Sequence, residues 1–314
     1  MATIDVDGLD ILIETDCFTA TIATEGYTSG VKGGSFQDKQ TGATDLGYGL
    51  DIADFLLEPA DNGKQDSKHP YHSSNATHGN IPKRYVELPQ ICTHAKKLPF
   101  DIYRGKDFVA VKQWFRWTEA TSDFDPGSLW EQFLVFPNGQ RYFFSCDRIT
   151  SANDSDALIF RLDLPGHLKH NQGQEFSDVY LSYHGKISST EFLNDFPPHK
   201  RNLYRRNNTD FPERMIRAYR VRTESSNNPW LGGLTLNPSD VYEGWCHQRG
   251  YVCFIQELGG RPIKKGEIFG AAYIIGFFDS IEQMNEVYDF HKGHSGIEIE
   301  ENNNSATWKL KEEP

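Results

Sequence analysis

Hydrophobic and aromatic residues recur along this chain in short runs that are separated by turn residues. Many of the runs alternate apolar with polar positions, which places successive side chains on opposite faces of a strand. The alternation is clear in Phe108–Glu119, and Trp130–Phe136 pairs with Arg141–Ser145 across an Asn138-Gly139 turn. The pattern therefore predicts a chain built mainly from antiparallel strands.

Two runs near the C-terminal end, Gly250–Gln256 and Phe269–Phe278, flank a polar link. We expect both to be strands that close a sheet built by earlier strands. Leu50–Leu57 fits either a strand or a short helix, whereas Ser280–His291 has helical spacing behind a serine cap. Further strands are expected at Ile11–Glu14, Phe18–Ile22, Arg84–Ile91, Leu158–Leu164, Val179–His184 and Met215–Thr223 (the last with one charged face), and helical turns at Ser189–Phe196 and Pro238–Tyr242.

Composition agrees with a sheet protein. Aromatic residues make up 13% of the 314 positions, and 27 Gly and 15 Pro divide the chain into many short segments. We expect an all-β fold, a large antiparallel β-sandwich with a few short helices. It would form a single domain over residues 1–294, followed by a polar, acidic tail over residues 295–314 that is mobile around Asn302–Ser305.

The net charge of −12 argues against general binding to nucleic acid. No apolar run has membrane-spanning length and no signal peptide is evident, so we expect a cytoplasmic protein or one whose leader has been removed. The five cysteines are widely spaced and suggest no disulfide framework. Positive charge gathers in Lys83–Lys106 and His199–Arg222, either as solvated faces or as a local site for an anionic ligand.

The two ends of the chain share a pattern with a known family. Near the C-terminal end, a strand reaches an acidic residue, and a Gly-Glu link then leads into a final strand; near the start, a strand and a glycine turn precede an Asp-Lys-x-Thr-Gly segment. This pattern resembles the galactose-mutarotase-like β-sandwich, which also occurs in polysaccharide lyases and glycoside hydrolases. The resemblance implies a sandwich that acts on carbohydrate. It rests on Phe18–Gly42, His78-Gly79, Val252–Glu257, Pro262–Glu267 and Phe269–Phe278.

Polar residues near the predicted strands suggest acid–base chemistry on a charged sugar. Elimination at a uronate needs a base, an acid and a cation that neutralises the carboxylate, and histidine and arginine suit these tasks. We therefore expect a polysaccharide lyase that cleaves an acidic oligo- or polysaccharide. Its acid and base would come from His78, His94, Tyr183, His184 and His247, and its substrate contacts from Arg84, Tyr85, Arg206, Arg249, Tyr251 and Glu257.

Other functions fit parts of the same pattern. An aldose epimerase would use a histidine and Glu257 as its proton pair. A glycosidase needs two carboxyl groups, and a carbohydrate-binding module would present exposed tryptophans. The carboxyl candidates are Glu87, Asp147, Glu243 and Glu257, and the tryptophans are Trp114, Trp117, Trp130, Trp230 and Trp245.

We expect neither a cofactor nor a bound metal, because the chain has no zinc-protease, paired-cysteine, calcium-loop or phosphate-loop motif. The one alternative is the polar loop Asp61–Asn80, in which His69, His72 and His78 could bind zinc.

Overall fold

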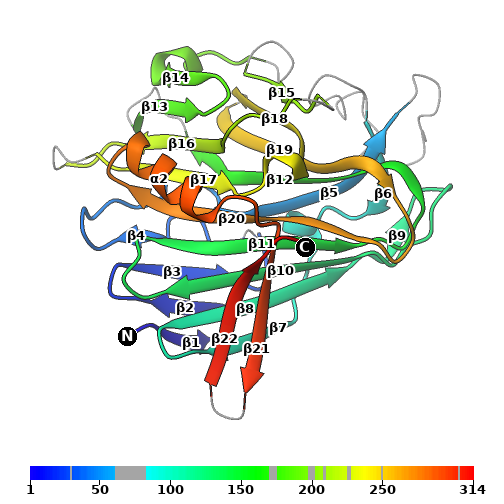
Figure 1. The fold of residues 1–314 in the computed structure, drawn as a ribbon, viewed down its shortest axis with the longest axis horizontal. Coiled ribbons are helices and arrows are strands. Elements are labelled where there is room, and N and C mark those ends of the chain that lie inside the picture. Colours follow the sequence, from blue (N-terminus) through cyan, green and yellow to red (C-terminus); the bar gives the residue numbers. More distant parts are fainter. Residues whose placement is uncertain are drawn as a thin grey trace.

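The computed structural model describes residues 1–28, 30–60, 83–169, 175–196, 202–207, 210–224, 228–248, 250–302 and 305–314. Within these ranges the strands form two large sheets, a four-stranded sheet and a two-stranded hairpin (Figure 1). All the pairings between them are antiparallel. The predicted all-β class and antiparallel sandwich are confirmed.

The larger sheet has nine strands, and its central strands carry long apolar runs. Their order is β14 (Gly185–Ser188), β13 (Phe176–Leu181), β16 (Met215–Val221), β17 (Trp230–Thr235), β20 (Ile268–Phe278), β11 (Tyr142–Thr150), β10 (Leu129–Pro137), β8 (Phe108–Arg116) and β7 (Phe100–Arg104).

The second large sheet has seven strands and carries the candidate site. Their order is β15 (Tyr204–Arg205), β18 (Val241–Gln248), β19 (Tyr251–Ile263), β12 (Ser155–Lys169), β5 (Ile52–Pro59), β6 (Lys83–Leu88) and β9 (Glu119–Ala120). The four-stranded sheet contains β1 (Thr3–Asp7), β2 (Asp10–Glu14), β3 (Phe18–Ala23) and β4 (Gln37–Asp38). The segment Leu50–Leu57, which fitted either a strand or a helix, falls largely within β5.

The main core lies between the two large sheets. Phe160 and Phe254 enter it from the seven-stranded sheet, and Phe143 and Tyr273 enter it from the nine-stranded sheet. Phe18 of the four-stranded sheet joins the same core. Because neighbouring residues of a strand point to opposite faces, this core fixes which side chains of the seven-stranded sheet point away from it.

The last two predicted strands do not close one sheet together. β19 lies between β18 and β12 in the seven-stranded sheet, whereas β20 lies between β17 and β11 in the nine-stranded sheet. The link between them therefore crosses from one sheet to the other. Both strands occupy central positions because both are apolar on the face that meets the core.

The C-terminal segment, expected to be a polar tail, contains a hairpin of β21 (Gly296–Asn302) and β22 (Ser305–Lys311). It packs on the outside of the nine-stranded sheet because Ile297, Trp308 and Leu310 interrupt its charged residues and contact the apolar cluster there. The predicted helix is confirmed as α2 (Ile281–His291), which lies on the same side and contributes Met284 and Tyr288.

Short helical elements complete the described part of the chain. They are α1 (Ile91–His94), η1 (Ser189–Phe192) and η2 (Pro238–Asp240). The strand expected at Arg84–Ile91 ends earlier, at Leu88, and α1 follows it. In the described residues, no helix is both long and apolar enough to cross a membrane.

One expectation about β16 is corrected. Arg217 was expected on a charged strand face, yet only 1% of its surface is exposed. Its guanidinium donates hydrogen bonds to the backbone oxygen of Ile255 at 2.6 Å and to Oε1 of Gln256 at 2.9 Å. The side chain thus crosses the space between the two large sheets.

Candidate active site

Charged side chains gather on the face of the seven-stranded sheet that points away from the main core, here called the outer face. On β18 and β19, Cys246, Phe254 and Leu258 belong to the main core. The alternating residues Glu243 and Glu257 therefore point to the outer face. Their strands place them directly opposite each other in the ladder.

Glu257 is fully buried on the outer face and contacts two cations. Its Oε1 accepts hydrogen bonds from Nε and Nη2 of Arg161 at 3.0 and 2.7 Å. Its Oε2 lies 2.8 Å from Nζ of Lys83, which is also 2.5 Å from Oε2 of Glu243. Glu243 in turn accepts a 2.7 Å hydrogen bond from Nε of Arg205. The guanidinium of Arg161 thereby fixes the orientation of the Glu257 carboxylate.

An indole ring packs beside this network. Nζ of Lys83 lies 5.1 Å from the ring centroid of Trp245, and the guanidinium carbon of Arg161 lies 5.5 Å from it. Trp245 is fully buried. Cation–ring contacts of this kind stabilise the charged groups where water is excluded.

A bulge in β12 builds the neighbouring part of the outer face. Asp163 pairs with Ile255 and His167 pairs with Cys253, so three residues of β12 lie opposite the single residue Phe254. In a regular strand, residues four apart are separated by about 13 Å. The bulge shortens this separation, and Oδ1 of Asp163 lies 2.9 Å from Nε2 of His167.

Further titratable side chains surround the Asp163–His167 pair. Burial raises the pKa of Asp54 to about 7, and the negative charge of Asp163 adds to the effect. Burial opposes the charged form of His167, but the facing Asp163 carboxylate outweighs it and raises the pKa of that imidazole. Burial raises the pKa of Tyr251 to about 12, and its ring centroid lies 5.1 Å from that of His167.

Some predicted site residues do meet on the outer face. Glu257 lies at its centre, and the buried His247 lies directly opposite Cys253. Tyr251 lies beside His167. Tyr85 belongs to a small apolar cluster with Tyr242 on the same sheet. Arg206 lies at the end of β18, where it donates a 2.7 Å hydrogen bond to the backbone oxygen of Gly259.

Other predicted residues lie elsewhere. His94 and His184 are exposed, the first in α1 and the second in the turn after β13. Tyr183 packs against the main core, and Arg84 pairs with Glu58 and Asp123 at the edge of the sheet. His78 and Arg249, together with the possible zinc ligands His69 and His72, fall outside the described residues.

Several important residues were not singled out from the sequence. Lys83 was counted only within a basic segment, and the strand containing Arg161 and Asp163 was expected to end at Leu164. The signal that could have revealed the site is the Leu-Pro-Gly-His sequence at 164–167. A proline and a glycine inside a strand indicate a bulge, and bulges often lie beside active sites.

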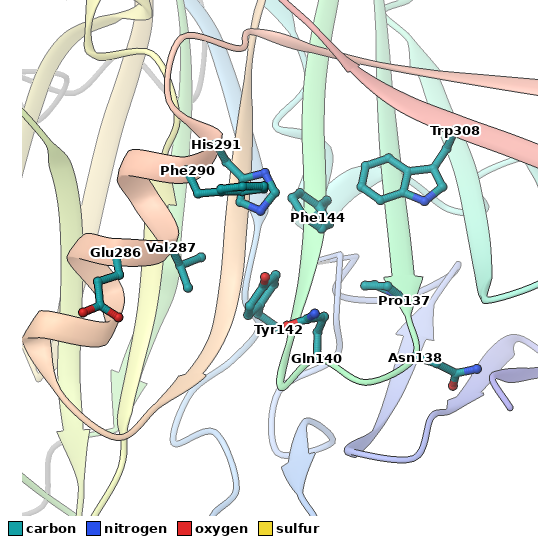
Figure 2. A pocket seen from close by; sticks show the side chains of 10 residues that line it. All are labelled: Pro137, Asn138, Gln140, Tyr142, Phe144, Glu286, Val287, Phe290, His291 and Trp308. Carbon is teal, nitrogen blue, oxygen red and sulfur yellow. The ribbon is translucent and has the colours of Figure 1, made fainter.

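A concave feature lies beside α2 and the C-terminal hairpin, on the outside of the nine-stranded sheet (Figure 2). A cavity of about 450 Å³ lies between α2 and the C-terminal hairpin, and its walls include the rings of Tyr142, Phe144, Phe290 and Trp308. Phe144 lies at its base with its ring centroid 4.7 Å from that of Trp308. Burial lowers the pKa of His291, one of the few titratable groups there. The cavity therefore offers fewer titratable groups than the outer face.

No family model and no curated protein matches the sequence. Solved structures do match. A galactose 1-epimerase from Lactobacillus acidophilus is 11% identical over 86% of this chain and 94% of that chain, with a TM-score of 0.43. A putative aldose 1-epimerase from Escherichia coli K12 is 7% identical over 88% of this chain and 99% of that chain, with a TM-score of 0.44.

An α-galactosidase from Geobacillus stearothermophilus is 9% identical over 89% of this chain but only 41% of that chain, with a TM-score of 0.46. With TM-scores below 0.5, these likenesses say nothing about the chemistry of this chain. The matched structures include galactose-mutarotase-like proteins, the group that the sequence resembles.

Proposed function

We propose that the protein is a carbohydrate-active enzyme that interconverts the anomers of a neutral sugar by proton transfer at the anomeric hydroxyl and the ring oxygen, as an aldose 1-epimerase does. The observation that carries this proposal is the buried Glu257 carboxylate, which Arg161 and Lys83 hold in one orientation on a rigid sheet. Proton transfer requires a carboxylate or imidazole at a fixed position relative to the reacting atoms. Glu257 is the proposed base for the anomeric hydroxyl.

The second proton-transfer position lies further along the strands, two residues from Glu257. Asp163 pairs with Ile255, two residues from Glu257, which corresponds to about 7 Å along the sheet. Ring opening needs a donor to the ring oxygen while the base holds the hydroxyl proton, and ring closure on the other face reverses both transfers. We assign the donor position to the part of the outer face around Asp163 and His167.

Charge pairing on the outer face favours a neutral ligand. Lys83, Arg161 and Arg205 each contact a carboxylate of Glu243 or Glu257. A uronate would have to displace one of these carboxylates from its cation, which leaves a buried charge without its partner. A neutral sugar brings no charge that competes with these ion pairs when it binds.

A uronate lyase is the second candidate, because three cations do gather on this face. In that reaction a cation neutralises the substrate carboxylate, a base removes the proton at C5 and an acid protonates the leaving oxygen. The acidic glycan expected from the sequence would then be the substrate.

One panel of assays separates the candidates. The purified protein is added to freshly dissolved neutral aldoses while optical rotation is followed, and to uronate polymers while ultraviolet absorbance is followed. Faster relaxation of the rotation supports the epimerase. Rising absorbance from an unsaturated uronate supports the lyase and overturns the epimerase. Retardation by polysaccharide in an affinity gel, without either signal, contradicts both enzymes and indicates a binding module.

A further inference from the structure

Three different metal-ligating side chains meet at the bulge of β12. One ligand atom from each of Asp163, His167 and Cys253 lies within 4.8 Å of the other two. We propose that these three side chains form a mononuclear site for a divalent transition-metal ion, and that Zn²⁺ is the ion they fit best.

The strands hold these side chains in place. Asp163 and His167 are brought together by the bulge, and Cys253 lies opposite His167 on the central strand β19. Asp163 is 2% exposed and Cys253 is 3% exposed. A site on paired strands in the interior of a sheet is more rigid than one on a loop, which suits the narrow distance range of metal coordination.

A bound ion would take the place of the direct contact between Asp163 and His167. Oδ1 of Asp163 lies 2.9 Å from Nε2 of His167, yet this buried oxygen has no hydrogen bond of acceptable geometry. A buried carboxylate oxygen in that state is costly unless something else coordinates it. A cation between the carboxylate, the imidazole and the thiolate would coordinate this oxygen.

The same three residue types could instead form a nucleophilic triad, but the geometry argues against it. In a triad the imidazole separates the nucleophile from the carboxylate, because one ring nitrogen faces each of them. Here the ligand atoms of Cys253 and Asp163 also lie within 4.8 Å of each other. Three ligand atoms this close to one another can all reach one ion.

The ligand set indicates the kind of ion. A thiolate, an imidazole and a carboxylate together suit Zn²⁺, whereas Ca²⁺ and Mg²⁺ prefer sets of oxygen ligands. Three protein ligands leave a fourth tetrahedral position open, as in catalytic rather than structural zinc sites. His247 lies opposite Cys253 in the ladder, so its side chain lies on the same face of the sheet.

Cobalt substitution gives a test that does not depend on any enzyme activity. The full-length protein is treated with a chelator, dialysed and titrated with Co²⁺ while its absorption spectrum is recorded. We expect a thiolate-to-cobalt charge-transfer band together with visible bands of tetrahedral intensity, saturating at one ion per chain. Histidines elsewhere in the chain could bind Co²⁺ but would give no thiolate band.

Variants locate the site. Cys253→Ser should abolish the charge-transfer band, and Asp163→Asn should weaken Co²⁺ binding by 10-fold or more, an order-of-magnitude expectation. Cys246→Ala is the matched control, because Cys246 is a buried cysteine of the neighbouring strand that points into the main core; it should keep the band. Circular dichroism of each metal-free variant checks that it is folded.

The inference is overturned if wild-type protein shows no thiolate band, or if the band survives in folded Cys253→Ser. Should that variant fail to fold, the wild-type spectrum and Asp163→Asn still decide the question. Every readout is spectroscopic and needs no sugar. The metal site can therefore be refuted while the proposed sugar chemistry is supported, or supported while that chemistry is refuted.

Discussion

On the outer face, ion pairs hold the charged residues of the candidate site in position. Glu257, His247 and Tyr251 were singled out from the sequence as candidate site residues, because they lie in or beside a predicted strand with an apolar face. Lys83 and Arg161 could not, since their importance depends on partners far away in the sequence. Lys83 contacts Glu243, 160 positions further along the chain, and no local pattern encodes such a pairing.

The Lys83 ammonium is predicted to be a large contributor to stability. Replacing it in Lys83→Met leaves Oε2 of Glu243 and of Glu257 without the cation that both contact in the interior. Removing one partner of a buried ion pair typically costs about 3–5 kcal/mol. Urea denaturation should therefore show a fall in the free energy of unfolding of this size.

Lys39→Met is the matched control for that experiment. Lys39 pairs with Glu14 at the surface, where the side chains are 36% and 63% exposed. Exposed pairs contribute about 1 kcal/mol or less. If the two variants lose similar stability, the buried network does not have the role assigned to it.

At the scale of the element, β12 determines the shape of the site. The sequence predicted its first half, Leu158–Leu164, and it continues through the bulge to Lys169. The sequence could not reveal that β19 and β20 lie in different sheets, because a short polar link between apolar runs equally fits a hairpin. The residues that decide between the two arrangements are on strands elsewhere in the chain.

The bulge is predicted to depend on Gly166. This residue has a φ of +96°, and a Cβ there would lie 1.8 Å from the backbone oxygen of Gly49. Gly166→Ala adds a strained backbone, which costs about 1–2 kcal/mol, to a direct overlap with a neighbouring segment. Thermal and urea unfolding should show a clear loss of stability.

Gly139→Ala separates the effect of backbone strain from the effect of the overlap with Gly49. Gly139 has a φ of +74°, but a Cβ there would meet nothing within 4 Å. Gly139→Ala should therefore lose only the stability that the strained backbone costs. Equal losses in both variants would mean that the contact between the bulge and Gly49 is unimportant.

At the scale of the whole molecule, the sandwich encloses polar groups as well as apolar ones. Asp51 and Asp147 are both fully buried. Asp147 accepts a 2.7 Å hydrogen bond from Nε1 of Trp130, and Asp51 accepts one from the hydroxyl of Ser145. Burial raises the pKa of Asp51, and the charge of Asp147 raises it further. Burial likewise raises the pKa of Asp147.

From the raised pKa values of these carboxyl groups, we expect the protein to lose stability as pH rises. A pKa that is higher in the folded chain than in the unfolded chain means that the folded chain binds more protons. The stabilisation is complete at acidic pH and is lost as pH rises from the unfolded value of 3.8 through the higher folded value. The slope approaches about 1.4 kcal/mol per pH unit for each proton concerned.

Asp51→Asn should flatten this dependence, because the amide mimics the protonated acid. The free energy of unfolding of the wild type and the variant is compared by denaturation between about pH 5 and about pH 8, around neutrality where most folded proteins are stable. The exposed Asp154, whose pKa is lowered by its contacts with Lys265 and Lys264, provides the control Asp154→Asn. A slope that is unchanged in Asp51→Asn would refute the raised pKa.

Glu257 is the proposed base, and its replacement by glutamine tests that role. Wild-type protein and Glu257→Gln are assayed for relaxation of the optical rotation of the neutral aldose on which the wild type is most active. Loss of a positioned general base should slow the rate by roughly 10²- to 10⁴-fold. Glu14→Gln, altered at the surface of the four-stranded sheet, should keep the wild-type rate. A folded Glu257→Gln with the wild-type rate would show that Glu257 is not the base.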